Sequence, residues 1–108
     1  CGGALLLGAA GLLEGRPAST NFHLLDALPK VGAEPRGGGQ VVVDGRIFTA
    51  GPVTGSFEAS LQVLAKLRGE DVARMVELTL EYDPHPPFGV GSPEKAGPAM
   101  TEQAKAVY

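Results

Sequence analysis

The fold is decided by the first thirteen residues of the chain, CGGALLLGAAGLL (residues 1–13). Cys1 is the only cysteine, and Gly2 and Gly3 follow it directly. The small apolar residues after them predict a helix over residues 3–13 that packs closely against a sheet. A thiol on a glycine turn at the start of such a helix has the layout of a nucleophile elbow, where backbone N–H groups and the positive helix end favour the thiolate. A lone cysteine is also often an inert core residue, so both interpretations are carried forward.

Length, composition and charge exclude several classes of function. The chain has 108 residues, a formal net charge of −3 and no tryptophan, which fits one small domain. Its lysines and arginines lie dispersed among acidic residues, so no nucleic-acid partner is expected. The longest apolar run is far below the roughly 18 residues that cross a bilayer, which argues against a membrane partner. No charged leader is present and one cysteine forms no internal disulfide, so a cytoplasmic protein is expected.

The beginning of the chain raises a separate question, because it does not start with methionine. It opens in what reads as the middle of a strand-turn-helix unit. We therefore expect either that an upstream part is absent from this sequence or that processing has exposed Cys1 as an N-terminus.

The first half of the chain has the rhythm of a βαβ unit. Residues 17–20 read as a short extended piece, and Asn21 is a suitable N-cap for a second helix that Pro29 and Gly32 close. After the flexible glycines at 37–39 come two β-rich runs, residues 40–43 and 46–49. The Asp44-Gly45 pair between them predicts a hairpin.

The second half reads as helical and then irregular. Apolar spacing predicts a long, well-buried helix over residues 56–68 with Gly69 as its C-cap. Glu70-Asp71 is expected to start a further helix that covers residues 72–81. The expected inner side of that further helix carries Val72, Met75, Val76, Thr79 and Leu80. Three prolines then forbid regular structure, so residues 83–108 are expected to form an extended C-terminal arm, with a short helix over residues 101–107. So few strands cannot cover four helices, so we predict that residues 1–108 are the C-terminal half of an α/β sandwich.

Five stretches carry a resemblance to a known family. Residues 1–20, CGGALLLGAAGLLEGRPAST, are similar to the elbow, helix and following strand of the ThiJ/PfpI superfamily, and most of all to its isonitrile hydratases. VDGR (residues 43–46) and TAGPVTG (residues 49–55) resemble that family's hairpin and the turn before its long helix. LEYDPHPPF (residues 80–88) and GSPEKAGP (residues 91–98) are similar to its C-terminal arm, which is the most specific part of the likeness.

The resemblance implies a flavodoxin-like three-layer sandwich, of the class I glutamine amidotransferase-like type, of which this chain is the C-terminal part. It implies a homodimer, a small-molecule substrate, and no metal or organic cofactor. In the family's hydratases the cysteine thiolate attacks an isonitrile carbon, a covalent thioimidate forms, and water releases an N-substituted formamide. A thiolate suits this soft, uncharged carbon. The family supplies the acid that protonates the carbon from its N-terminal half.

The implied site residues are Cys1 as nucleophile and Gly2, Gly3, Thr54 and Gly55 around the substrate or its developing negative charge. The sequence departs from the family at two of its motif positions. Gly2 stands where the hydratases commonly have threonine, and Asn21 stands where many members have histidine. His23 lies two places on and points to a different helix face, so the histidine role is not transferred to it.

Other chemistry-bearing residues are interpreted as structural. His85, between two prolines, is expected to help tie down the arm. Residues 37–39 follow no clear strand and open no helix, so they are not a phosphate-binding loop. Glu58, Glu77 and Glu81 are interpreted as solvated helix charges.

Alternatives to a hydratase remain. One is a non-enzymatic ligand-binding or redox-sensing domain, as in regulators of the AraC type, although no helix-turn-helix pattern follows Tyr82. Another is an amidase or peptidase type of the same superfamily. A third is an N-terminal nucleophile whose α-amino group acts as base, which the helix directly after Cys1 argues against.

Overall fold

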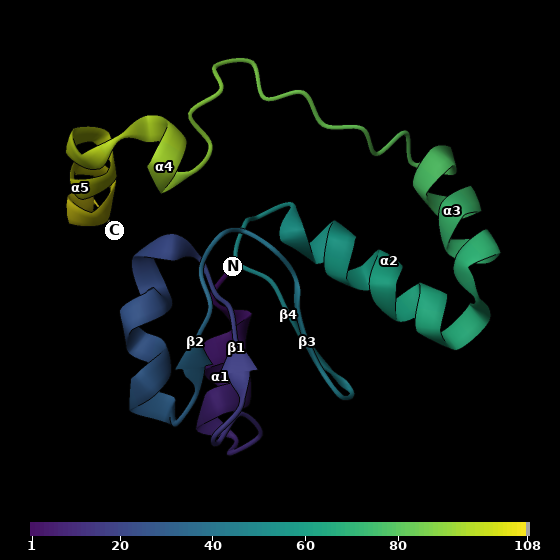
Figure 1. Cartoon of the computed structure of the whole chain (residues 1–108), viewed down its shortest axis with the longest axis horizontal. Helices are drawn as coiled ribbons and strands as arrows, with labels where there is room; N and C mark the ends of the chain where they lie inside the picture. The colour runs from purple at the N-terminus through teal and green to yellow at the C-terminus, as the bar shows by residue number, and fades with distance from the viewer. Residues whose placement is uncertain (108) are drawn as a thin grey trace.

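The computed structural model of the chain describes residues 1–107. Its elements alternate between short strands and helices in the first half and are helical in the second (Figure 1). In chain order they are α1 (Gly3–Ala9), β1 (Pro17–Ala18), the 3₁₀ helix η1 (Phe22–Val31), β2 (Glu34–Pro35), β3 (Val42–Asp44), β4 (Ile47–Thr49), α2 (Gly55–Arg68), α3 (Glu70–Thr79), α4 (Pro93–Ala96) and α5 (Pro98–Val107).

The predicted βαβ rhythm is present, with a 3₁₀ helix as the crossover. β1 and β2 pair in parallel, with Ala18 opposite Pro35, and η1 connects them. Asn21 caps η1 as expected, because its side chain accepts a hydrogen bond from the N–H of His23. Gly32 ends η1 with a φ of +80°, a conformation that favours glycine. Pro29 lies inside η1, so the expectation that it helps to close the helix was wrong: the φ that proline imposes is compatible with a 3₁₀ helix.

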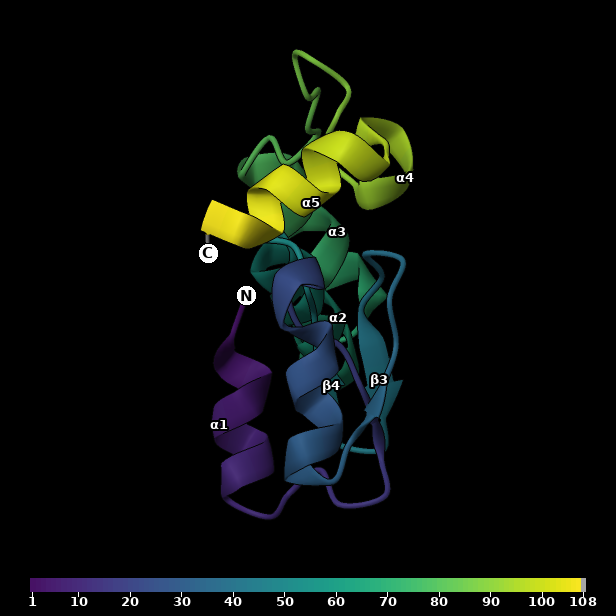
Figure 2. The same cartoon turned by 90° about the vertical axis from the view of Figure 1, so that its left-hand side faces the viewer.

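The first helix is shorter than predicted. α1 ends at Ala9, not at Leu13, because the chain leaves the helix through a turn in which Gly11 has a φ of +82°. Leu13 is fully buried from this turn and joins Ala4, Ala18 and Leu28 in the core. The small residues of α1 do permit close packing, but the tightest approach is to a helix. A Cβ on Gly8 would lie 2.2 Å from a Val31 methyl group, and α1 and η1 run side by side (Figure 2).

The predicted hairpin is confirmed. β3 and β4 pair antiparallel with Asp44 opposite Ile47, and Gly45 in the turn between them has a φ of +60°. A buried hydrogen bond links the hairpin to the parallel pair, since the N–H of Ser19 donates to Thr49 Oγ1 at 2.9 Å. On the surface, Arg16 lies 3.1 Å from the carboxylate of Asp44. These contacts bring the two short sheets into one body.

The two long helices have the predicted positions but not the predicted burial. α2 begins one residue before the expected start, and Gly69 follows it as its C-cap. α3 spans Glu70–Thr79, so it starts at Glu70-Asp71 as expected but ends before residue 81. Met75 is 63% exposed and Leu80 is 52% exposed, so the inner side assigned to α3 was wrong. α3 packs against α2 and buries Ala73, while its larger apolar residues Met75 and Leu78 are exposed. α2 itself buries only Gly55, so its expected burial was also wrong.

The C-terminal segment is only partly extended. The chain is irregular through residues 83–92 and then forms α4 and α5, so the final helix begins at Pro98 and not at residue 101. Ser92 caps α4 by accepting a hydrogen bond from the N–H of Lys95, and Pro93 occupies its first turn. This segment arches from the end of α3 over the body to α4 and α5 (Figure 1).

The chain is flat and open. It measures 41 × 38 × 17 Å, and its radius of gyration of 14.9 Å exceeds the value of about 13 Å typical of a domain of this length. Helices α1 and η1 lie on one side of the short strands, and α2 contacts β4. The fold class is α/β, as predicted, and the open shape fits about half of a flavodoxin-like sandwich.

Candidate active site

Cys1 is fixed by its main chain at the end of β1. Its carbonyl oxygen accepts a 2.8 Å hydrogen bond from the N–H of Asn21 and a second hydrogen bond from the hydroxyl of Thr20. Gly2 is the N-cap of α1, so Cys1 stands immediately before that helix, and its side chain is exposed. The carboxyl ends of strands are the common place for ligand sites in α/β folds. The sole cysteine therefore lies at the strand end where α/β folds commonly have their ligand sites.

Thr20 was not singled out in the sequence, although it holds the cysteine. Thr20 is the second residue after β1 and is only 2% exposed. Its hydroxyl donates a hydrogen bond to the Cys1 carbonyl. The next residue, Asn21, uses its N–H for Cys1 and its side-chain oxygen for His23, whose Nδ1 lies 2.6 Å away. A polar residue at a strand end was the available signal. The pairing of residues 1 and 20 is long-range and could not be read from spacing.

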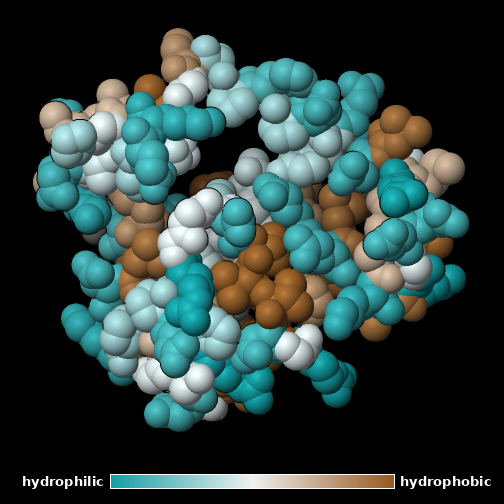
Figure 3. Space-filling view, viewed as in Figure 1, coloured by the Kyte–Doolittle hydropathy of each residue, from teal (hydrophilic) through white to brown (hydrophobic). Residues whose placement is uncertain are grey.

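A cavity of about 490 Å³ opens beside these residues. Its wall includes Thr20 and Asn21, so the groups that hold Cys1 also line the cavity. The rest of the wall consists of Ser19, Phe22, Leu25, residues 37–39, residues 51–54, and Pro86 and residues 91–94 of the arm. Figure 3 shows the opening between the arm and the body. The volume is within the range of small-molecule sites.

The structure brings some of the predicted site residues together and leaves others apart. Thr54 lines the cavity together with Thr20 and Asn21. Gly55 is buried as the first residue of α2, where an added Cβ would lie 2.9 Å from the Cβ of Ala50. Gly2 packs near Leu24, while nothing lies within 4 Å of a Cβ built on Gly3. Cys1, Gly2, Gly3 and Gly55 are not among the residues that form the cavity wall.

A second group of polar residues lies at the start of α2. The hydroxyl of Tyr82 donates a 2.8 Å hydrogen bond to Glu58, and its ring stacks on Phe57 at a centroid distance of 5.6 Å. Partial burial raises the pKa of Tyr82, as does the hydrogen bond to Glu58, whereas a hydrogen bond with Thr54 lowers it. Glu58 is therefore not simply a solvated charge, which corrects the interpretation made from the sequence. Tyr82 and Glu58 are connected to the cavity through Thr54, which interacts with Tyr82 and also lines the cavity.

The remaining candidates from the sequence are His85 and residues 37–39. His85 lies 3.7 Å from Asp83, a residue of the same exposed arm, so this ion pair does not attach the arm to the body. Residues 37–39 form part of the cavity wall rather than a plain connection. Within residues 1–107, no group of three or more histidine, cysteine, aspartate or glutamate side chains is placed to hold a metal ion. Of the helices in that same range, none has the length and apolarity needed to cross a membrane.

Comparison with known proteins finds clear matches, among them a curated enzyme and a solved structure. The chain is 45% identical over 105 residues to an isonitrile hydratase of Pseudomonas putida, a match that covers 97% of this chain and 46% of that protein. It superimposes on the crystal structure of a ThiJ/PfpI family protein from Pseudomonas syringae with a TM-score of 0.86 and 41% identity. The chain belongs to the ThiJ/PfpI superfamily. The resemblance recognised in the sequence is thus confirmed by both sequence and fold, although no family model matches the chain.

The match also bears on how much of a ThiJ/PfpI protein is present. The superposition covers 96% of this chain but 42% of the Pseudomonas syringae protein. The chain therefore spans about half the length of the relatives it matches. This agrees with the short strands, the exposed apolar faces of α2 and α3, and the expectation of a half sandwich.

Proposed function

We propose that this chain supplies the cysteine nucleophile and part of the substrate cavity of a hydratase that converts isonitriles to N-substituted formamides. The observation that carries the proposal is the 45% identity to an isonitrile hydratase along 97% of the chain. Two features of the structure support it. Cys1 is exposed, so a substrate can reach it, and its carbonyl is bound by two residues of a cavity wall.

The proposed reaction runs in two covalent steps. The sulfur of Cys1 forms a bond to the isonitrile carbon, and a proton is added to that carbon to give a thioimidate. The added proton balances the one that the thiol gives up. Water then adds to the thioimidate carbon, the carbon–sulfur bond breaks, and the thiol recovers its proton as the formamide leaves. The net change is one water added to one isonitrile, with no oxidation or reduction.

The surroundings of Cys1 suit the first step. The hydrogen bonds from Thr20 and Asn21 fix the main chain of the nucleophile, which limits the freedom lost on reaching the transition state. Gly2 brings no side chain near the sulfur, so its main-chain N–H is the group it can offer to developing negative charge. The cavity of about 490 Å³ beside Thr20 and Asn21 accommodates the substituent on the isonitrile nitrogen.

The test is formamide production by the intact gene product and by its Cys1→Ala and Cys1→Ser variants. We expect the wild-type protein to convert an isonitrile labelled with ¹³C at the reacting carbon to the labelled formamide, observed by NMR. Each variant should lose at least about a thousandfold in kcat, because the nucleophile is removed. Glu70→Gln, on the exposed side of α3, is the control and should keep wild-type activity. Unchanged turnover in Cys1→Ala would overturn the proposal.

The same experiment separates the hydratase from the other superfamily types. A thioimidate on Cys1 would appear in the intact mass of the protein as the addition of one whole isonitrile. Binding of the isonitrile without turnover would instead support a ligand-binding domain, and release of ammonia from an amide substrate would support an amidase. The proposal includes a homodimer, which the mass of the intact gene product in solution tests.

A further inference from the structure

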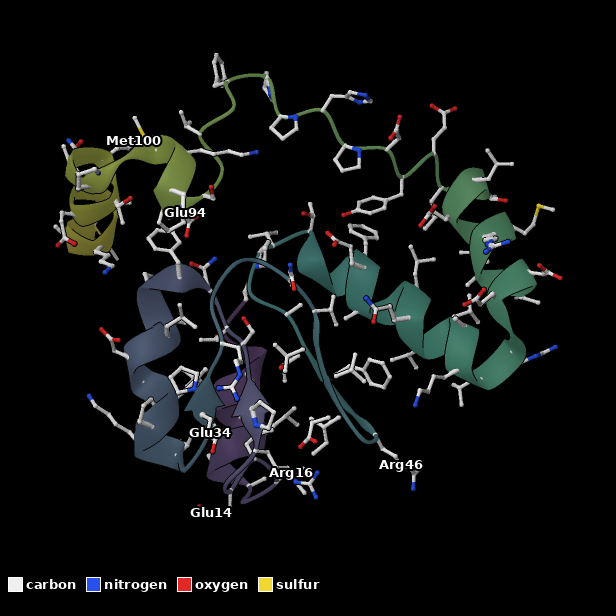
Figure 4. All side chains as sticks on the ribbon, viewed as in Figure 1. Glu14, Arg16, Glu34, Arg46, Glu94 and Met100 are labelled. Atoms are coloured by element: carbon white, nitrogen blue, oxygen red, sulfur yellow. The ribbon has the colours of Figure 1, made fainter. Side chains whose placement is uncertain are left out.

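Glu94 brings a carboxylate to the cavity from the arm. It lies in the first turn of α4, which Ser92 caps, and it forms part of the cavity wall. In Figure 4 the labelled side chain lies on the side of α4 that faces η1. The same wall includes Thr20 and Asn21, the residues bound to the Cys1 carbonyl. Glu94 therefore lines the cavity together with the two residues that hold the main chain of the nucleophile.

The charge of the cavity comes from Glu94. Among the lining residues that the structure describes, it is the one with an ionisable side chain, and the others are hydroxyl, amide, glycine and apolar residues. Its carboxylate makes no ion pair or hydrogen bond with another residue in the range 1–107, and Lys95 beside it does not line the cavity. Glu94 is exposed at the edge of this otherwise neutral space, so its unpaired carboxylate attracts cations and repels anions as a solvent-screened charge.

We propose that Glu94 makes this cavity selective for substrates that carry a positively charged group remote from the reacting carbon. The inference rests on the proposed function, and it narrows the substrate class to amino-substituted isonitriles. The hydrocarbon part of the substrate lies against Phe22, Leu25 and Val53, which supply the apolar wall. The ammonium binds Glu94 through a charge-assisted hydrogen bond, and the isonitrile carbon points toward Cys1.

The test compares two substrates of equal length in the intact gene product, pentyl isonitrile and 4-aminobutyl isonitrile. We expect kcat/KM to be about fivefold higher for the amino compound, as for one solvent-exposed ion pair. The ratio should fall to about one in Glu94→Gln, which keeps the shape of the side chain and removes its charge. Glu102→Gln on α5 makes the same change in net charge outside the cavity and should keep the wild-type ratio. A ratio that Glu94→Gln leaves unchanged overturns the inference.

A binding measurement distinguishes failure of this inference from failure of the proposed function. Calorimetry with N-pentylformamide and N-(4-aminobutyl)formamide needs no turnover. If neither isonitrile is hydrated, the hydratase proposal fails, but a tighter Kd for the amino compound that depends on Glu94 still supports cation selectivity. Equal Kd values in the wild-type protein overturn that selectivity, whether or not the enzyme turns over.

Discussion

The N–H of Asn21 donates a 2.8 Å hydrogen bond to the carbonyl oxygen of Cys1, so the start of η1 holds the main chain of the nucleophile. The hydroxyl of Thr20 donates to the same oxygen. The end of β1 and the start of η1 thus position the cysteine through its backbone and leave its thiol exposed.

Removing one of these two donors should impair catalysis more than stability. Thr20→Val keeps the shape of the buried side chain but leaves the Cys1 carbonyl with Asn21 alone. We expect kcat for isonitrile hydration to fall by about tenfold, since small displacements of a nucleophile are costly. Thr20→Ser restores a hydroxyl and should recover most of the rate. Steady-state kinetics of both variants checks this, and a wild-type kcat in Thr20→Val would contradict it.

The close approach of α1 to η1 predicts opposite effects for two glycine substitutions in one helix. In Gly8→Ala the new Cβ meets Val31, so the free energy of unfolding should fall by about 1–3 kcal/mol. Gly3→Ala meets nothing within 4 Å and should be neutral or stabilising by up to about 1 kcal/mol. Chemical denaturation of the two variants compares them directly. Equal stability would show that α1 and η1 are not in tight contact.

One of the contacts that link the two sheets is a buried hydrogen bond to a side-chain oxygen. Thr49→Val removes the acceptor for the buried N–H of Ser19, which should lower the free energy of unfolding by about 1–3 kcal/mol. Thr79→Val is the matched control, because that hydroxyl bonds the Met75 carbonyl on an exposed surface and its loss should cost no more than about 0.5 kcal/mol. Urea denaturation distinguishes the two. A control as destabilised as Thr49→Val would speak against the link.

Tyr82 should titrate above the ordinary tyrosine pKa of 10.0, because partial burial and the hydrogen bond to Glu58 disfavour its phenolate. The folded protein then keeps the phenol proton to higher pH than the unfolded chain. The stability this contributes is fully present below about pH 10 and is lost as pH rises through the raised folded pKa.

Phenolate absorbance, measured as the difference between wild type and Tyr82→Phe, gives this pKa directly. Glu58→Gln removes the negative charge beside the phenol and should move the titration back toward the ordinary value. Glu70→Gln should leave it unchanged, because Glu70 does not contribute to the shift. A Tyr82 pKa that Glu58→Gln does not lower would contradict the assignment.

Local features of the fold were predictable where the deciding groups are neighbours in sequence. The Asp44-Gly45 pair predicted the hairpin, Asn21 predicted the cap of η1, and Gly69 predicted the end of α2. The 3₁₀ geometry of η1 was not predictable, because its apolar pattern also suits an α-helix. For the same reason the end of α1 was predicted too late. The apolar run continues beyond Ala9 through a turn in which Gly11 has a positive φ.

Long-range features were harder, and the site depends on them. The spacing of Met75 and Leu80 marks an apolar surface, but it does not say which element covers that surface, and in this chain both are exposed. Cys1 was identified from its glycine turn, whereas its attachment to Thr20 joins residues nineteen positions apart. The bond between Tyr82 and Glu58 and the place of Glu94 in the cavity wall likewise arise only when distant segments meet.

The segment that arches between α3 and α4 can change in length during evolution without disturbing the rest of the fold. Within the part of the chain that the structure describes, residues 83–91 make no backbone hydrogen bond to the strands or helices beneath them. Insertions and deletions are tolerated best in such stretches, because little folding energy depends on their length. Homologues in which this stretch is longer or shorter would have a cavity of different size, with the positions of Cys1 and of the β3–β4 hairpin unchanged. Such variants would bind different substrates and would still fold.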